Sequence, residues 1–219
     1  MTLVRPEFEP TLPALVRRKL GVRERTTILV LVALLALAIA AIVLVRPRVD
    51  RTSEVVHGDA PAFTLQYRND LFHDEPPEAG ELARLAGRRG RQAVTITVRP
   101  FGLPGREGNV AQAFLPIHAS GHIERLGLDL DGFELRAEHR ARVHDAPGYE
   151  VRFRSGARGR YTFGSDLMLL PSEEASTGGL LLSLRREVRG SPRLSAAEEE
   201  FADLAMEAMR SVRFGTGPV

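Results

Sequence analysis

The chain has 219 residues, of which 43% are hydrophobic and 26% are charged, and this composition excludes a collagen-like or wholly disordered protein. It contains no cysteine, which excludes disulfides, cysteine-based metal sites, a cysteine nucleophile and a lipid-modified cysteine. Residues 1–25 contain six basic and three acidic residues, whereas residues 46–219 contain 24 basic and 25 acidic ones, so the net charge of +2 comes from the N-terminus. Because nucleic-acid-binding domains carry positive charge on the folded body, we predict no nucleic-acid partner.

The first predicted element is a single transmembrane helix over residues 26–45, whose sequence TTILVLVALLALAIAAIVLV contains no charged residue. A helix of this length is about 30 Å long, which matches the thickness of a bilayer core. Six basic residues precede it and three arginines follow within residues 46–51, so we expect the N-terminus in the cytoplasm and the C-terminal domain outside the cell membrane.

This helix is expected to remain as a signal anchor. The small-residue pattern Ala38-Ile39-Ala40 lies inside the apolar run, and Arg46-Pro47-Arg48 makes a poor cleavage site. A cleaved signal, including a twin-arginine signal at Arg17-Arg18, stays open as the alternative. The predicted organisation is therefore a cytoplasmic tail (1–25), the anchor (26–45), a polar stalk (46–60) and an extracytoplasmic domain (61–219).

Within that domain, alternating apolar residues predict strands, and period-3.6 patterns predict helices. The segment FTLQY at residues 63–67 and the β-branched segment AVTITV at residues 93–98 are typical of strands. Residues 79–85 and 109–126 are expected to be helical, the second with Pro116 and Gly121 inside it. Short connections then favour four antiparallel strands in succession, over residues 133–143, 149–154, 160–170 and 180–188.

The last predicted element is an amphipathic helix that begins after Ser195. The segment Ser195-Ala196-Ala197-Glu198 is a capping box, in which the serine and glutamate side chains satisfy each other's backbone donors. Apolar residues then recur at helical spacing and predict one buried stripe, before a short extended piece at residues 211–214. The stripe consists of Phe201, Leu204, Ala205, Ala208 and Val212.

These elements predict an α+β sandwich with a mostly antiparallel sheet. The opening FTLQY strand, the helix before the long meander, the PGYEVRF strand and the final helix closing on SVRF together resemble the PsbP-like fold family over residues 60–214. That family includes actinobacterial envelope proteins of the LpqN type. The resemblance implies a binding or accessory module without enzymatic activity. It also shows a departure, because those lipoproteins carry a lipidated cysteine where this chain has an apolar segment.

Residues with catalytic or metal-binding chemistry do not form a recognised motif. His118 and His122 are four residues apart in a helical stretch, but HASGH lacks the glutamate of a zinc-protease motif, so we predict no metal and no cofactor. Gly164-Ser165-Asp166 lacks the frame of a nucleophile elbow. A hydrolase site around His139, His144 and Ser165 or Asp166 is kept as an alternative, although no sequence spacing connects these residues.

The candidate binding residues are arginines on the predicted meander. Because side chains alternate across a strand, the polar positions of these strands are expected on one face, where six arginines accompany Glu134, Glu138 and Glu150. Such a face either is solvated and held by cross-strand ion pairs, or docks an anionic partner. The six arginines are Arg136, Arg140, Arg142, Arg152, Arg154 and Arg160.

The function predicted from the sequence is that of a single-pass membrane protein with an extracytoplasmic binding or accessory domain. This domain would dock an envelope protein or an anionic envelope component, a polymer or a lipid. The alternatives are a membrane-anchored hydrolase and a sensor that acts through a cytoplasmic partner of residues 1–25.

Overall fold

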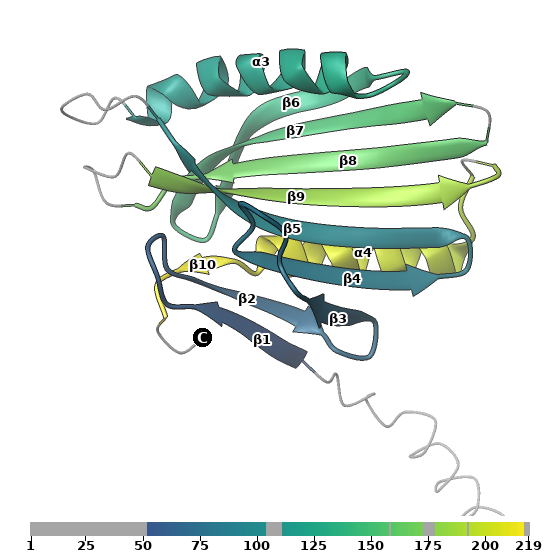
Figure 1. Cartoon of the computed structure of the whole chain (residues 1–219), viewed down its shortest axis with the longest axis horizontal. Helices are drawn as coiled ribbons and strands as arrows, with labels where there is room; N and C mark the ends of the chain where they lie inside the picture. Colours follow the sequence, from purple (N-terminus) through teal and green to yellow (C-terminus); the bar gives the residue numbers. More distant parts are fainter. Residues whose placement is uncertain (1–51, 104–110, 158, 173–177, 192, 217–219) are drawn as a thin grey trace, which may run out of the picture. The chain divides into compact units, whose positions relative to one another are not determined.

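The computed structural model describes residues 52–103, 111–157, 159–172, 178–191 and 193–216, which belong to one compact unit (Figure 1). The predicted tail (1–25), the predicted transmembrane segment (26–45) and the start of the predicted stalk lie outside the described residues. Within the described part of the chain, no helix combines the length and the apolar character that a membrane span requires.

A small antiparallel sheet contains the first strands of the described chain. Strand β1 (Thr52–His57) pairs with β2 (Phe63–Arg68), and β2 pairs with the last strand, β10 (Arg213–Phe214). The predicted strand at FTLQY is thus present as β2. Residues 52–57 were expected in a polar stalk and instead form β1, because Val55 packs against the core and the backbone of β2 supplies hydrogen-bond partners along the whole strand.

The main sheet has seven strands in the order β3-β4-β5-β9-β8-β7-β6, and every pairing described within it is antiparallel. It confirms the predicted α+β class with mostly antiparallel strands. The four strands expected in succession form one continuous meander. The strands are β3 (Phe72–Glu75), β4 (Ala83–Arg89), β5 (Gln92–Gly102), β6 (Glu134–Val143), β7 (Ala146–Ala157), β8 (Arg160–Leu169) and β9 (Gly178–Arg189).

The helix predicted over residues 79–85 is wrong. Strand β4 begins at Ala83 and pairs with both β3 and β5. Ala83, Leu85 and Gly87 are buried while Arg84 and Ala86 are less so, which is the two-residue period of a strand. The alanine-rich composition of this stretch favours a helix locally, but burial on the sheet overrides that preference.

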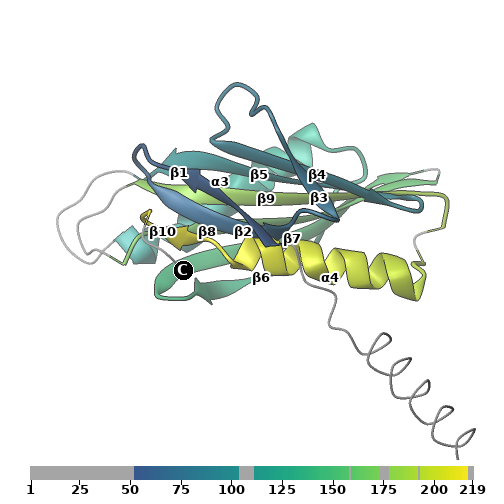
Figure 2. The ribbon, with the colours of Figure 1, turned by 90° about the horizontal axis from the view of Figure 1, so that it is seen from below.

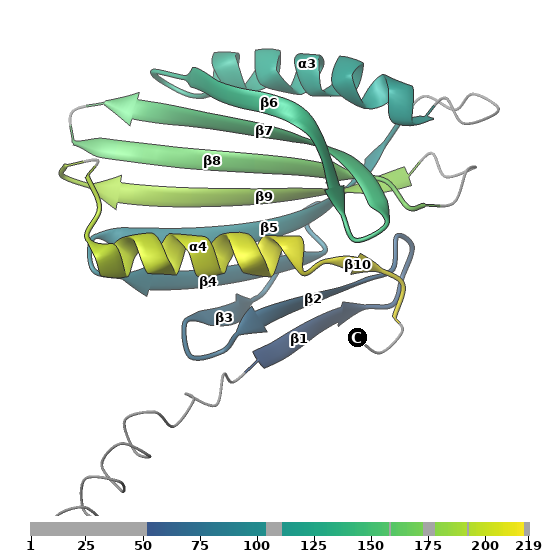
Figure 3. The same cartoon turned by 180° about the vertical axis from the view of Figure 1, so that it is seen from behind.

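Two helices cover opposite faces of the main sheet. Helix α3 (Ala111–Asp129) confirms the predicted helix that contains Pro116, and helix α4 (Ala196–Arg210) confirms the terminal one. Residues at the end of β8 show this division between the two faces. Leu167 and Leu169 belong to the core under α4, whereas Met168 and Leu170, the residue that follows the strand, belong to the core under α3. Figure 3 shows α4 in front of the sheet, and Figure 1 shows the molecule from the opposite side.

Helix α4 joins the small sheet to the large one (Figure 2). Its capping box is formed, since Ser195 Oγ accepts from the Glu198 amide and the Glu198 carboxylate accepts from the Ser195 amide at 2.9 Å. Phe201 is fully buried and stacks on Phe72 with the ring centroids 5.0 Å apart. The predicted apolar residues from Phe201 to Ala208 therefore form the inner face of α4, with Leu204 at its edge, and Val212 is buried just after the helix ends.

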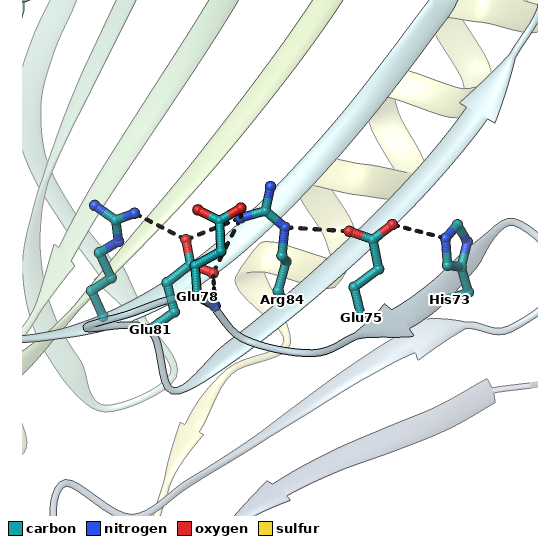
Figure 4. A network of polar contacts seen from close by, with 6 residues as sticks. His73, Glu75, Glu78, Glu81 and Arg84 are labelled. Carbon is teal, nitrogen blue, oxygen red and sulfur yellow. Dashed lines mark hydrogen bonds and ion pairs between the residues drawn. The ribbon is translucent and has the colours of Figure 1, made fainter.

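A network of charged side chains closes the turn between β3 and β4 (Figure 4). The buried Glu81 carboxylate accepts hydrogen bonds from Arg99 Nη2 at 2.9 Å, Arg84 Nη1 at 3.2 Å and the Glu78 amide at 3.1 Å. Burial acts to raise the pKa of Glu81, but these hydrogen bonds and the charge of Arg84 outweigh it, so the pKa is lowered. Arg84 of β4 also pairs with Glu75 of β3, and Arg99 lies on β5, so the network connects this turn to three strands.

Candidate functional site

The six predicted arginines do not share one face. Strand β6 contains a bulge between Leu135 and Ala137, so that its residues change sides relative to β7. Before the bulge, Glu134 is opposite Arg154. After it, odd-numbered residues of β6 are opposite the even-numbered residues of β7, as with His139 and Glu150.

This change of alternation places the six predicted arginines on different faces of the sheet. Arg152 and Arg154 lie on the α4 face, with Arg136 at the bulge, where its side chain lines a cavity on that face. Arg140 and Arg142 are opposite Tyr149 and Pro147, which places them on the α3 face. The expected single face is thus corrected, because the alternation of an unbroken strand does not continue through a bulge. Arg160, at the start of β8, is exposed and pairs in register with Arg189.

A cavity of about 420 Å³ lies between α4 and strands β5, β9, β8 and β7, next to the bulge of β6. Its walls are partly apolar and partly basic, with four arginines and a single carboxylate among the residues that line it. This size falls within the range of about 300–1,000 Å³ that is usual for small-molecule sites. The lining residues are Val94, Arg136, Arg152, Phe153, Phe163, Gly164, Ser165, Leu184, Arg186, Ala202, Asp203, Met206 and Arg210.

Glu150 of β7 organises one wall of this cavity. Its buried carboxylate accepts hydrogen bonds from Arg152 Nε at 2.7 Å, Ser165 Oγ at 2.9 Å and Arg210 Nη2 at 3.4 Å. His139 Nε2 lies 3.3 Å from the same carboxylate. Burial acts to raise the pKa of Glu150, but the bonds from Arg152 and Ser165 and the charges of both arginines outweigh it, so the pKa is lowered. Glu150 therefore stays ionised and holds two arginines at the cavity.

Arg186 of β9 differs from the other three arginines of the cavity. Its Nε is buried and has no hydrogen-bond partner among the described residues. Its guanidinium carbon lies 4.5 Å from the ring centroid of Phe163, so the ring supports one side of the guanidinium. Burial lowers the pKa of Arg186, and the charges of Asp203 and Glu199 only partly offset this effect. An oxyanion in the cavity would supply the acceptor that Nε lacks.

A second buried polar side chain without a partner lies on the same face of the sheet. Gln92 is fully buried, and neither its amide nitrogen nor its amide oxygen has a hydrogen-bond partner among the described residues. On β5 it is two residues from Val94, which is opposite Arg186. Buried polar groups in proteins are normally hydrogen-bonded. Of these two residues, Arg186 lines the cavity and Gln92 does not.

Glu134 forms ion pairs with Arg136 and Arg154 at the edge of the cavity. Its carboxylate oxygens lie 3.0 Å from Arg136 Nη1 and 2.9 Å from Arg154 Nη2. Arg154 also lies over the ring of Tyr161, at 5.9 Å from the centroid. The four cavity arginines and Arg154 make five positive charges, and Glu134, Glu150, Glu199 and Asp203 make four negative ones, which leaves a local excess of one.

On the opposite face, Arg140 and Arg142 line a smaller cavity of about 310 Å³ between α3 and the edge of the sheet. Leu115, Pro116 and Tyr149 form much of its wall. The two arginine clusters are thus separated by the thickness of the sheet, and a single flat partner would not contact both.

The two histidines considered as metal ligands have different partners. His122 Nε2 lies 2.6 Å from Oδ2 of the fully buried Asp166, which also accepts a hydrogen bond from Arg185 Nη2 at 3.0 Å. His118 stacks on Phe101 at 5.2 Å, and burial lowers its pKa. Among the described residues there is no group of three or more potential metal-ligating side chains. Asp166 therefore fastens α3 to the sheet.

The residues of the hydrolase alternative are not arranged as a nucleophile and its base. Ser165 donates to Glu150, and His139 contacts the other oxygen of that carboxylate, so the carboxylate lies between the hydroxyl and the imidazole. In a catalytic triad the imidazole lies in the middle. Asp166 faces α3 on the other side of the sheet, and His144 is exposed in the turn between β6 and β7.

Comparisons with known proteins concern the fold. No protein-family model matches the chain, and no curated protein matches it in sequence. The chain is similar to LpqN of Mycobacterium tuberculosis, described as involved in cell envelope biogenesis, with 12% identity and a TM-score of 0.48 over 75% of this chain and 92% of that one. It is also similar to the cyanobacterial PsbP (CyanoP) of Synechocystis sp. PCC 6803, with 12% identity and a TM-score of 0.42 over 76% and 94% of the two chains.

The roles of three residues of the site, Arg186, Arg210 and Glu150, were not predicted from the sequence. Arg186 and Arg210 lie on β9 and α4, outside the meander positions from which the arginine face was built. Glu150 was counted as an outward residue of that face and is instead buried. One signal was present in the sequence, because Arg186 interrupts the apolar pattern of β9 on its buried face.

Proposed function

We propose that this chain is an extracytoplasmic binding domain that docks an anionic envelope component, and that the anionic group enters the cavity between α4 and the main sheet. The observation that carries this proposal is Arg186, whose buried Nε has no hydrogen-bond partner among the described residues and lies in a cavity with three further arginines. A desolvated guanidinium gains a charge-assisted hydrogen bond when an oxyanion binds it.

The charge of the surrounding residues supports an anionic ligand over a cationic one. The cavity and its charged neighbours contain more arginines than carboxylates. Glu150 and Glu134 each hold two arginines in place, which pre-organises the basic groups before a ligand arrives. Pre-organised charges of one sign in a concave site raise the local concentration of the opposite charge.

Binding is favoured over catalysis because the polar groups at the cavity are occupied with one another. The Ser165 hydroxyl donates to Glu150, whose pKa is lowered, so this carboxylate is poorly suited to accept a proton near neutral pH. In this proposal the residues of the cavity recognise a ligand, and the chain is not an enzyme.

The location of the domain rests on the apolar segment at residues 26–45 and the basic residues around it. In our proposal this segment anchors the chain in the cell membrane and places the binding domain on the outer side, within reach of envelope polymers, lipids and proteins. A role as a sensor would require a cytoplasmic partner for residues 1–25 and has no specific observation in its favour.

The proposal is tested by the thermal unfolding of the full chain in a nonionic detergent, with sulfate, inorganic phosphate or acetate added. A ligand that binds only the folded state raises Tm as its concentration increases. We expect the oxyanions to raise the Tm of the wild-type chain by more than that of Arg186→Gln, and the difference to shrink as sodium chloride is added, because salt screens partly exposed charges.

The matched control is Arg88→Gln, which removes an exposed arginine of β4 outside the cavity. It should respond to the oxyanions as the wild type does. If wild type, Arg186→Gln and Arg88→Gln all give the same Tm increase with every anion, the cavity does not bind the anionic group and the proposal fails.

A further inference from the structure

We infer that the cavity takes a phosphate monoester with a compact apolar organic part, with the phosphate at Arg186 and the organic part against Phe163, Leu184 and Met206. This inference rests on the proposed function and names the chemical class of its ligand. Its basis is the combination, in one cavity, of a basic group without a partner, more arginines than carboxylates, and an apolar wall.

The basic group fixes the place of the phosphate. The Phe163 ring covers one side of the Arg186 guanidinium, and the Nε hydrogen is free to donate. Arg152 and Arg210 are held at the same cavity by Glu150. A phosphate has enough oxygens to accept from Arg186 and from one or both of these neighbours, whereas a carboxylate has only two.

The positive charge of the cavity favours an anionic headgroup over a neutral one. A phosphate monoester carries a charge of about −1.5 to −2 at neutral pH, whereas a carboxylate carries a single charge. The monoester therefore interacts more strongly with the arginines at the cavity than a carboxylate does.

The apolar wall indicates that the ligand has an organic part. Val94, Leu184 and Ala202 are buried and line the cavity, and Phe163 and Met206 are half-buried there. Inorganic phosphate would contact the arginines and leave this wall uncovered. A ring or short chain on the phosphate would cover it, and burial of apolar surface adds to affinity.

The volume limits the size of the organic part. A cavity of about 420 Å³ accommodates a single ring or a short chain beside the phosphate, but not the two acyl chains of a phospholipid. The inferred ligand is therefore a small phosphate monoester, or one such group at the end of a larger molecule. The alternative source of the phosphate is a lipid headgroup that carries both of its acyl chains, and the experiment distinguishes the two.

The test is isothermal titration calorimetry of the full chain in a nonionic detergent with four probes: inorganic phosphate, phenyl phosphate, phenol and soluble dihexanoyl phosphatidic acid. We expect phenyl phosphate to bind at least about tenfold more tightly than inorganic phosphate, because the ring covers the apolar wall. Phenol should show no binding at the same concentrations. Dihexanoyl phosphatidic acid should bind more weakly than phenyl phosphate, because its second chain does not fit.

Variants assign the two parts of the ligand to the two parts of the cavity. Arg186→Gln should weaken inorganic and phenyl phosphate alike, by at least about tenfold. Ala202→Leu should fill the apolar side and weaken phenyl phosphate while leaving inorganic phosphate unchanged. Met206→Gln is the second variant for the apolar side, and it serves if Ala202→Leu prevents folding. Arg88→Gln should bind all four probes as the wild type does.

The outcomes separate this inference from the proposed function. If inorganic phosphate binds in an Arg186-dependent manner but phenyl phosphate binds no more tightly, the organic part of the ligand is overturned and the anion site stands. Tighter binding of dihexanoyl phosphatidic acid than of phenyl phosphate overturns the compact ligand in favour of a lipid. If neither phosphate binds, this inference fails, and the proposed function fails with it only if sulfate and acetate also give no Arg186-dependent increase in Tm.

Discussion

The ring of Phe153 covers Gly164 on the neighbouring strand, in the space that the Cβ of any other residue would occupy. Phe153 also contacts Phe133, at 5.5 Å between ring centroids, and supports the Arg185 guanidinium at 4.8 Å. Arg185 of β9 donates to Asp166, which in turn contacts His122 of α3. Because Gly164 has no side chain, the Phe153 ring of β7 can lie against Arg185 and so support the contact between the sheet and α3.

We therefore predict that Gly164→Ala destabilises the domain by about 1–3 kcal/mol, because the new methyl group displaces the Phe153 ring. The measurement is the urea midpoint of unfolding. Gly102→Ala is the control, since a Cβ at that position meets no atom within 4 Å. Equal midpoints for the two variants would contradict the close approach of Phe153 to Gly164.

The second prediction concerns the buried aspartate under α3. Asp166→Ala should cost about 3–5 kcal/mol, because it removes the buried carboxylate of an ion-paired cluster and leaves the half-buried Arg185 and His122 side chains without their partner. Asp131→Ala, at an exposed carboxylate in the turn before β6, should change stability little. A chemical denaturation series of both variants checks the difference, and similar losses in the two would show that the Asp166 contacts contribute nothing.

The third prediction concerns the apolar face of α4. Phe201→Ala should cost about 3–5 kcal/mol, because the ring is fully buried and stacked on Phe72. Ser195→Ala should cost about 1 kcal/mol through loss of the helix cap. Denaturation midpoints that do not shift in either variant would mean that α4 contributes little to the stability of the fold.

The fourth prediction is a pH dependence that comes from the capping box. Hydrogen bonds from the Ser195 and Arg91 backbone amides lower the pKa of Glu198 from 4.5 to about 2. A carboxylate whose pKa is depressed by folding stabilises the folded state above its unfolded pKa, and this contribution is lost as the pH falls toward the folded value. The stability difference between wild type and Glu198→Gln should thus be constant above pH 4.5 and shrink as the pH falls toward about 2.

Urea denaturation of both proteins across this acidic range measures that difference. Comparing the two chains at each pH removes the effect of the other carboxylates, which titrate in both. A difference that stays unchanged down to about pH 2.5 would show that Glu198 is not held in its ionised form by the cap.

The fifth prediction is the topology of the full chain. If residues 26–45 remain as an anchor with the domain outside, protease added to intact spheroplasts should remove the large domain and leave a small membrane-bound fragment. Disrupted membranes treated in the same way give the comparison, because only there is the N-terminal tail also accessible. A soluble mature chain that begins near residue 46 would show cleavage instead of anchoring.

Most of the fold could be predicted from local patterns. The strand at residues 63–67, the meander, the helix containing Pro116 and the capped terminal helix all have short-range signals, such as alternation, turn glycines and the serine–glutamate cap. The failures lie where a distant partner decides the structure. Strand β1 depends on pairing with β2, and Ala83–Arg89 becomes a strand because β3 and β5 lie on either side of it.

The site was less predictable than the fold for the same reason. Arg152 was identified from its own strand, but Arg186 and Arg210 come to the cavity from β9 and α4 through the tertiary structure. No spacing in the sequence connects these three residues. The ion pairs of Glu150 are equally invisible in the sequence, because its partners come from β7, from β6 and from a helix about 60 positions later in the chain.

The bulge between Leu135 and Ala137 has a consequence for how this surface can vary among related chains. Arg136 is the extra residue, because Leu135 and Ala137 are opposite Phe153 and Arg152, which are consecutive residues of β7. Deletion of Arg136 would remove the bulge, while His139 would stay opposite Glu150 and Arg140 and Arg142 would stay on the α3 face. The edge strand can therefore gain or lose one arginine at the cavity without any change in the pairing of the residues that follow.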